Sequence, residues 1–469
     1  MREEKEGFPE EERENRLLNR FEKMRREGVF RYMDVTEYEE IIDAYLDKGQ
    51  YDKAEQTVQL SLRQHPSAFS LVLKKAEIHL ARADYLLALE VLNPLTRLDP
   101  NNYEVFLLRG FALTHLEREQ EAVRDYDRAL ALGSGMEGDI AFQAATELEM
   151  RGYYKKARVY MEKAYELNPF DIQAMFELAF LCHQTGEEQK AIDIYERYLR
   201  EEPFDEGAWN NLGEVRMSTG EYEQALEAFE FQLAIHPGSP DGLFNRARAM
   251  MGLGRYPEAI ESLRKYLEKV PDDMEAMLLL GDSYRETGET RRALSWYKVA
   301  AAESPEDPEP CYRAAVLYRM TGMSEEAEVC CMRSLEIDPG NAVFNHELFL
   351  IWESRRPARE RLLLIKNITA AEPGNIVFWL DYLSLLYELR EMSELERALE
   401  DAFRHLPAHP LLMYMKGSIR LLEGKTAEGE DLLAGALAKH FEGHDAFLQR
   451  FPRLASLPEV KSLIDKFKH

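Results

Sequence analysis

Apolar and small residues recur at helical spacing along most of the chain, in segments separated by short polar breaks. The stretch 206–239 shows the pattern clearly, with one helical segment on each side of a break at 218–220. Gly213 and Ala225 are small, so the two predicted helices can approach each other closely there. Pro237 ends the second helix, because proline lacks a backbone N–H and disfavours helical geometry in the residue before it. The sequence therefore predicts an antiparallel helical hairpin.

The hairpin pattern repeats along the chain. Alanines in register with Ala225 are spaced by 34 residues, except for one step of 35, and stand at Ala54, Ala88, Ala122, Ala157, Ala191, Ala225, Ala259, Ala293 and Ala327. A proline follows twelve residues after eight of these nine alanines, and Ser134 takes its place in the remaining unit. A single hairpin leaves an apolar face exposed, so such units are stable only when they stack on one another.

Except in the first unit, where Ile42 stands, the first helix of each regular unit also has a small residue at its closest approach to the second helix. These residues are Ala76, Gly110, Ala145, Ala179, Gly213, Ala247, Gly281 and Ala315. With the alanines and prolines, they make the chain resemble the tetratricopeptide repeat (TPR) family, whose unit has 34 residues. The resemblance implies an all-α fold, a right-handed α-solenoid (superhelix) of about twelve helix-turn-helix units with capping helices at both ends.

The register predicts four regions in chain order: a disordered N-terminus followed by a capping helix (1–34), nine regular units (35–341), three degenerate units (342–443) and two C-terminal capping helices (444–469). One extra residue near 133–138 predicts a longer turn between two units. Beyond residue 341 the proline spacing persists, but Arg361, Leu395 and Gly429 stand where alanine is expected. Helices there are predicted to pack more loosely or at another angle, and a separate small helical domain remains an alternative.

Charge and cysteine content narrow the classes of function. The formal charge is -27, from 59 basic and 86 acidic side chains, which opposes generic binding to nucleic acid or to anionic lipid. Cys182, Cys311 and Cys331 fall on packing positions of the repeat, which predicts buried free thiols and a reducing compartment. The N-terminus lacks a signal-peptide pattern, and no apolar run reaches membrane-spanning length. We therefore expect a cytoplasmic protein without membrane insertion.

The sequence contains two partial matches to catalytic motifs, and both are incomplete. Residues 423–426 are similar to the end of a phosphate-binding loop, but Ile419 stands where that loop needs glycine. Residues 346–347 begin like a zinc-protease helix, but Leu350 replaces the second histidine. The repeats occupy nearly all of 35–443 and leave no room for a catalytic domain. The sequence predicts no enzyme activity, no cofactor and no metal.

The resemblance implies a concave groove lined by the second, fifth, ninth and twelfth residues of each first helix. Its predicted apolar lining is Phe142, Phe176, Phe180, Phe244 and Tyr312, with Met217 and Met251. Its predicted polar lining is Asn210, Asn211, Asn245, Arg248, Arg285 and Arg319. Aromatic rings and methionines can bury apolar surface of a ligand. Asparagine amides can form hydrogen bonds with a peptide backbone, and arginines can pair with ligand carboxylates. Two alternatives stay open: neighbouring helices bury each ring, and Asp282 and Glu286 neutralise the arginines.

We therefore expect a non-enzymatic protein–protein interaction scaffold that binds a peptide or a partner helix in this groove. Glu39, Asp43, Asp47 and Glu77 make the N-terminal end of the lining acidic, which suits a basic partner segment. The Lys and Asn set with which some TPR domains hold the C-terminal carboxylate of chaperones is missing from the first units. A regulatory or assembly subunit of an enzyme complex, held through the convex face or the C-terminal units, is the alternative. The partner's identity and the oligomeric state stay open.

Overall fold

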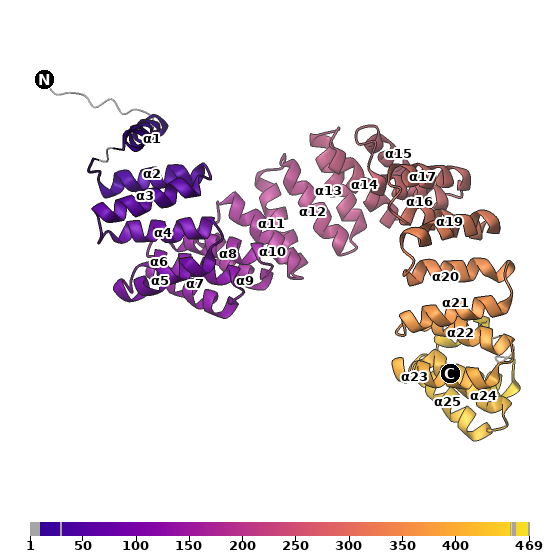
Figure 1. Cartoon of the computed structure of the whole chain (residues 1–469). Helices are drawn as coiled ribbons and strands as arrows, with labels where there is room; N and C mark the ends of the chain where they lie inside the picture. Colours follow the sequence, from indigo (N-terminus) through magenta and orange to yellow (C-terminus); the bar gives the residue numbers. More distant parts are fainter. Residues whose placement is uncertain (1–9, 29–30, 451, 453–455, 468–469) are drawn as a thin grey trace. The chain divides into compact units, whose positions relative to one another are not determined.

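The computed structural model describes residues 10–28, 31–450, 452 and 456–467, and no strand occurs among them. Consecutive helices form antiparallel hairpins in tandem (Figure 1), which confirms the predicted all-α solenoid architecture. The chain divides into two compact units, Met1–Pro237 and Gly238–His469, which are described separately. The boundary falls inside the region predicted as one regular array.

The first unit begins with α1 (Glu10–Glu27). Its hairpins then follow in chain order: α2 (Val35–Asp47) with α3 (Tyr51–Gln64), α4 (Phe69–Ala81) with α5 (Tyr85–Leu98), α6 (Tyr103–His115) with α7 (Glu119–Leu132), α8 (Glu137–Met150) with α9 (Tyr154–Leu167), α10 (Ile172–Gln184) with α11 (Glu188–Glu201), and α12 (Glu206–Ser218) with α13 (Tyr222–Ile235).

The second unit continues the same pattern. Its helices are α14 (Pro240–Gly252) with α15 (Tyr256–Leu267), α16 (Met274–Glu286) with α17 (Thr290–Glu303), α18 (Glu309–Met320) with α19 (Ser324–Ile337), α20 (Ala342–Ile351) and the short η1 (Trp352–Ser354) with α21 (Ala358–Ala371), α22 (Ile376–Glu388) with α23 (Met392–His405), α24 (Pro410–Leu422) with α25 (Thr426–Lys439), and the terminal α26 (Gly443–Arg450) and α28 (Pro458–Phe467).

Local sequence explains where these helices begin and end. The Asp205 side chain caps α12 by accepting a hydrogen bond from the backbone N–H of Ala208 at 2.9 Å. Asp171 and Asp273 cap α10 and α16 in the same register, and such caps stabilise a helix by about 1 kcal/mol. Gly220, in the turn between α12 and α13, has a φ of 78°, a left-handed conformation that glycine adopts without steric cost. This turn coincides with the predicted break at 218–220.

The closest approach within a hairpin is a fit of a small residue to a large one. A Cβ built on Gly213 would lie 2.4 Å from the Phe229 ring, and Gly110 and Gly281 are related in the same way to Tyr126 and Tyr297. Units with alanine at this place carry smaller partners sixteen residues later, at Leu92, Met161, Leu263 and Cys331, and Ala179 with Tyr195 is the exception. Each hairpin therefore balances the side-chain volume at its crossing.

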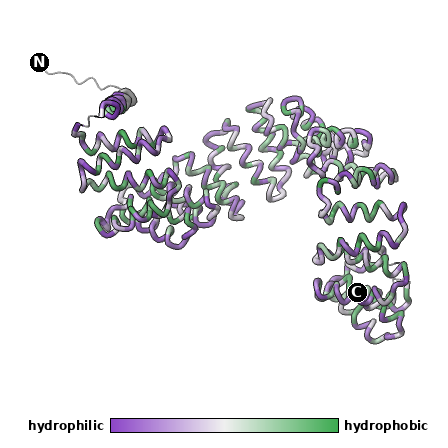
Figure 2. Tube along the Cα trace, viewed as in Figure 1, coloured by the Kyte–Doolittle hydropathy of each residue, from purple (hydrophilic) through white to green (hydrophobic). Residues whose placement is uncertain are grey.

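The core of each unit runs through successive hairpins, because every helix buries one face and exposes another. Figure 2 shows hydrophobic and hydrophilic residues interspersed along the helices. At the N-terminal end, Phe21 of α1 is buried and its ring meets Tyr38 of α2 edge to face, with centroids 6.2 Å apart. Thus α1 covers the first hairpin.

Several smaller predictions fall on the ends and turns of the array. The longer turn predicted near 133–138 is wrong, because the turn between α7 and α8 has four residues, as do the turns before α6 and α10. The extra residue lengthens α8, which has 14 residues where α6 and α10 have 13. Gly135 in this turn has a φ of 86°. The sequence predicts disorder up to about residue 12, but α1 already begins at Glu10. Residues 1–9 lie outside the described part of the chain, as does Leu454 in the predicted C-terminal caps. Cys182, Cys311 and Cys331 are buried and free, as predicted. In the described part of the chain, no helix combines the length and apolarity needed to cross a bilayer.

Candidate functional site

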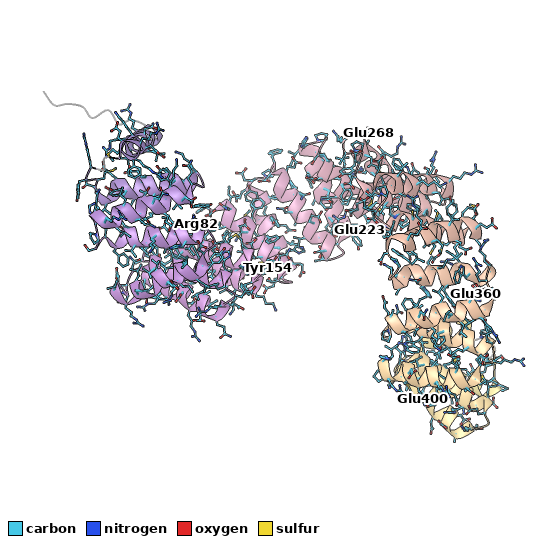
Figure 3. All side chains as sticks on the ribbon, in the orientation of Figure 1. Arg82, Tyr154, Glu223, Glu268, Glu360 and Glu400 are labelled. Carbon is cyan, nitrogen blue, oxygen red and sulfur yellow. The ribbon has the colours of Figure 1, made fainter. Side chains whose placement is uncertain are left out.

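The predicted aromatic lining of the first unit lies on α8 and α10. Phe142 and Phe176 are half-buried against the core. Phe176 also packs between the rings of Tyr195 and Tyr198, with centroids 5.7 and 5.5 Å away. Phe180 is 39% exposed. Its ring lies edge-on to that of Tyr154, which Figure 3 labels, with centroids 6.4 Å apart. Among these three rings, Phe180 offers the most surface to a ligand.

The polar lining predicted on α12 is only partly available to a ligand. Asn210, Asn211 and Met217 are all half-buried. The Asn211 side chain forms a hydrogen bond with the Tyr195 side chain of the preceding hairpin, which lowers the pKa of that phenol against the larger effect of burial. Asn211 therefore connects neighbouring hairpins by a hydrogen bond, and that hydrogen bond competes with any bond from the same amide to a peptide backbone.

Two carboxylates on this face escaped the sequence prediction. Burial, together with the charge of Glu177 on α10, raises the pKa of Glu149 on α8 to about 6. Burial also raises the pKa of Glu177. Among the ion pairs of the described residues, none joins either carboxylate to a Lys or Arg. Glu149 lies four residues after Ala145, as Met217 lies four residues after Gly213, so it occupies the twelfth place of its repeat unit and the lining rule itself would have found it.

Glu149 is expected to make the chain more stable at pH 5 than at pH 7. Its folded-state pKa of about 6 exceeds the ordinary value of 4.5, so the folded chain binds this proton more tightly than the unfolded chain. Stability is therefore gained as the pH falls through the folded pKa. Thermal melts of the wild type and Glu149→Gln at both pH values test this prediction. We expect a higher midpoint for Glu149→Gln at pH 7 and a weaker pH dependence; identical pH dependences would contradict it.

In the second unit, the predicted residues of α14 interact with one another. Asn245 is buried, and Arg248 donates from Nη1 to the Asn245 Oδ1 at 3.1 Å. The same guanidinium lies 5.9 Å from the centroid of the Phe244 ring, and Phe244 packs on Tyr266 with centroids 5.2 Å apart. The α14 residues thus form a packed cluster, with the half-buried Met251 at the end of the helix.

The arginines of α16 and α18 are engaged in ion pairs. Arg285 pairs with Asp282 at 3.2 Å and with Glu286 at 2.9 Å, which is the internal neutralisation considered from the sequence. Arg319 donates from Nε to the Glu347 carboxylate on α20 at 2.5 Å, and that carboxylate is buried. Both guanidiniums therefore have structural partners within the second unit.

Tyr312 of α18 is also packed within the second unit. The residue is half-buried, and its ring lies 4.9 Å from the ring of Phe344 on α20. Burial raises the pKa of its hydroxyl, and the charge of Glu347 adds to that effect. Tyr312 therefore contributes to the joint between two hairpins.

The acidic end of the lining also contains a lysine. Lys74 of α4 lies 2.8 Å from the Asp43 carboxylate and 2.9 Å from the Glu77 carboxylate. Burial and the neighbouring carboxylates raise the pKa of Glu104 on α6. Lys74 therefore offsets part of the negative charge predicted there for a basic ligand.

Several solved structures are similar to parts of this chain. Among solved structures, the MamA protein is 18% identical, covering 37% of this chain and 94% of its own, with a TM-score of 0.34. YrrB, described as a TPR protein with an unusual peptide-binding site, is 22% identical, covering 40% and 96%, with a TM-score of 0.35. A tetratricopeptide repeat protein from Parabacteroides merdae is 17% identical, covering 54% and 99%, with a TM-score of 0.41. No curated protein matches the sequence.

Family models carry the assignment, because they match the repeats themselves. Models described as tetratricopeptide repeat match residues 39–102, 73–137, 142–206, 208–242, 244–308 and 308–341. The first two segments overlap, the others follow with only short gaps, and together they span more than half of the sequence. The chain belongs to the tetratricopeptide repeat family.

Proposed function

We propose that the protein is a non-enzymatic interaction scaffold that binds a peptide segment of a protein partner on the first-helix face of its first unit. The observation that carries the proposal is the neighbourhood of α8 and α10. Phe180 offers an exposed ring there, and Glu149 and Glu177 have raised pKa values without a Lys or Arg ion-pair partner among the described residues. Stacked repeats present such a continuous surface to extended or helical ligands.

The chemistry of this face defines the ligand. An apolar or aromatic ligand side chain buries surface against Phe180, and a neighbouring Lys or Arg supplies the positive charge that Glu149 and Glu177 lack. A ligand cation favours the ionised form of both carboxylates, so binding lowers their pKa values, and Glu149 releases protons on binding near pH 6. In the second unit, Arg285 and Arg319 already have carboxylate partners. We therefore place the peptide on the first unit.

Phe180→Ala combined with Glu149→Gln is expected to weaken capture of the partner at least tenfold. Loss of an aromatic contact at the centre of an interface costs about 2 kcal/mol or more, and loss of a charge pair adds to it. The tagged full-length chain is used to capture proteins from its native cells, followed by quantitative mass spectrometry. Circular dichroism verifies that the variant keeps its helical content.

The matched control is Phe204→Ala, which removes a ring exposed in the turn between α11 and α12. The control is expected to recover partners as the wild type does. Undiminished recovery with the double variant would show that the partner binds elsewhere, as the alternative of a regulatory or assembly subunit requires.

A further inference from the structure

A large groove lies between α21 and α23, with α22 as its floor. The cavity has a volume of about 800 Å³. Trp379 and Tyr382 form its floor, and Lys366, Glu394, Ala398 and Asp401 are among the residues of its walls. None of these residues belongs to the predicted peptide-binding lining. The groove is formed by second helices of neighbouring hairpins, so it lies on a different face from the lining on the first helices.

The sequence of this hairpin explains why its helices leave space. Leu383 and Leu395 stand where the 206–239 hairpin has Gly213 and Ala225. Both leucines are fully buried, so two large side chains separate α22 from α23. This is a physical reason for the looser packing predicted in the degenerate units.

The equivalent groove at the 206–239 hairpin is smaller, because its own side chains fill part of the space. There α11 and α13 flank α12, and the cavity measures about 270 Å³. Trp209 and Trp379 occupy the same repeat position, and each indole Nε1 donates to a proline carbonyl, Pro203 or Pro373, at 2.8 Å. The tryptophan in the floor of each groove is therefore held in the same way.

The two grooves differ in the aromatic ring that covers the tryptophan. Phe231 of α13 stacks on Trp209, with centroids 4.5 Å apart and planes at 17°. The corresponding position in α23 is Asp401, whose carboxylate pairs with the exposed Arg404 at 2.7 Å. Ala370 also replaces the longer Arg200 at the opposite wall. The groove over Trp379 thus lacks the ring and the long side chain that fill its counterpart. The His405 ring in its lining lies farther from the indole, with centroids 6.4 Å apart.

We propose that the α21–α23 groove binds an aromatic side chain presented by a protein partner, seated against Trp379 where Phe231 lies against Trp209. This inference rests on the proposed scaffold function but uses a separate face. The floor is held before binding, because the Tyr382 hydroxyl donates to Glu394 at 3.0 Å and Lys366 pairs with the same carboxylate at 2.7 Å. A preformed floor reduces the ordering cost of binding, and aromatic pairs in this geometry are attractive.

The test uses N-acetyl-phenylalaninamide as the probe and the indole N–H resonances of the ¹⁵N-tryptophan-labelled full-length chain. The four tryptophans provide one signal each, assigned by single Trp→Phe variants. The probe is expected to shift the Trp379 signal in a saturable way and to leave the Trp209 signal unchanged, because Phe231 already covers Trp209. N-acetyl-alaninamide, which lacks the ring, is expected to shift neither signal.

Two reciprocal substitutions, which swap the residues at equivalent positions of the two grooves, make the test specific. Asp401→Phe supplies the missing ring and is expected to reduce probe affinity at Trp379 at least tenfold. Phe231→Asp removes the ring from the other groove and is expected to create a saturable shift of the Trp209 signal. Circular dichroism verifies the fold of both variants, and neither substitution touches Phe180 or Glu149, so failure here is distinguishable from failure of the proposed function.

The proposal is overturned by an unshifted Trp379 signal, by equal shifts with both probes, or by unchanged affinity in Asp401→Phe. Light scattering of the wild type and Asp401→Phe measures their molar masses and tests whether a second copy of this chain occupies the groove. If the wild type self-associates and Asp401→Phe is monomeric, the groove holds an aromatic residue of a second copy, and the assignment to a protein partner is wrong. Equal molar masses for the two chains support the partner.

Discussion

Replacing Gly213 with alanine is expected to destabilise the hairpin of α12 and α13 by about 1–3 kcal/mol, the usual cost of overpacking a well-packed core. The added Cβ would lie 2.4 Å from the Phe229 ring, well inside the 3.0 Å that real Cβ atoms keep. Phe229 is fully buried, so its ring has no open space into which to move. Amide hydrogen exchange of α12 and α13 measures the effect locally, because each repeat in a stacked array contacts chiefly its neighbours.

A compensating substitution tests the reason given for this cost. Phe229→Leu in the Gly213→Ala background recreates the Ala247 and Leu263 combination of the following hairpin, and it is expected to restore most of the lost protection. Gly207→Ala in the first turn of the same helix is the matched control. The nearest atom to its built Cβ is 3.4 Å away, so this change is expected to be neutral or slightly stabilising. Equal losses at both glycines would refute the crossing explanation.

Replacing Arg319 with methionine is expected to destabilise the hairpins around α18 and α20 by about 3–5 kcal/mol, the cost of leaving a buried charge without its partner. Glu347 is 4% exposed, and Arg319 meets its two carboxylate oxygens at 2.5 and 3.3 Å. Methionine keeps much of the aliphatic packing of the arginine, so the loss reflects the charge. Urea unfolding followed by hydrogen exchange of α18–α20 measures it.

The double variant Arg319→Met/Glu347→Leu is expected to recover most of that loss, because apolar pairs often replace buried ion pairs without cost. Arg404→Met is the control at an exposed ion pair, and its effect is expected to stay within about 1 kcal/mol. A loss in Arg319→Met no larger than that in Arg404→Met would show that Glu347 is solvated or paired with another residue. In that case Arg319 would again be available to a ligand.

The hairpins were predictable because their causes lie close together in the sequence. Gly213 and Phe229 are sixteen residues apart within one unit, and the glycine and proline positions that end its helices recur every 34 residues. The regular period therefore identified the helices, their turns and the family. The degenerate region followed the same logic, since Leu383 and Leu395 occupy the places of small residues and are buried in the structure.

The candidate site was less predictable, because the same register place has different surroundings in each hairpin. Phe176 and Phe180 share one helix, yet Phe176 packs between two tyrosines while Phe180 is exposed. Arg285 finds its carboxylates within its own helix, so the sequence suggested that pairing. Glu347, the partner of Arg319, lies in another hairpin, and no spacing rule pointed to it.

By itself, the sequence determined the repeat, its helical hairpins and the TPR family. The contacts that hold a hairpin together join residues of the same unit, and the same pattern of residues recurs in every unit. The tertiary structure alone decided which lining residues are already engaged, that Glu149 and Glu177 lie close enough to raise a pKa, and that a groove opens over Trp379. These features depend on side chains that meet across neighbouring hairpins. Their burial and charge balance arise only when the hairpins stack.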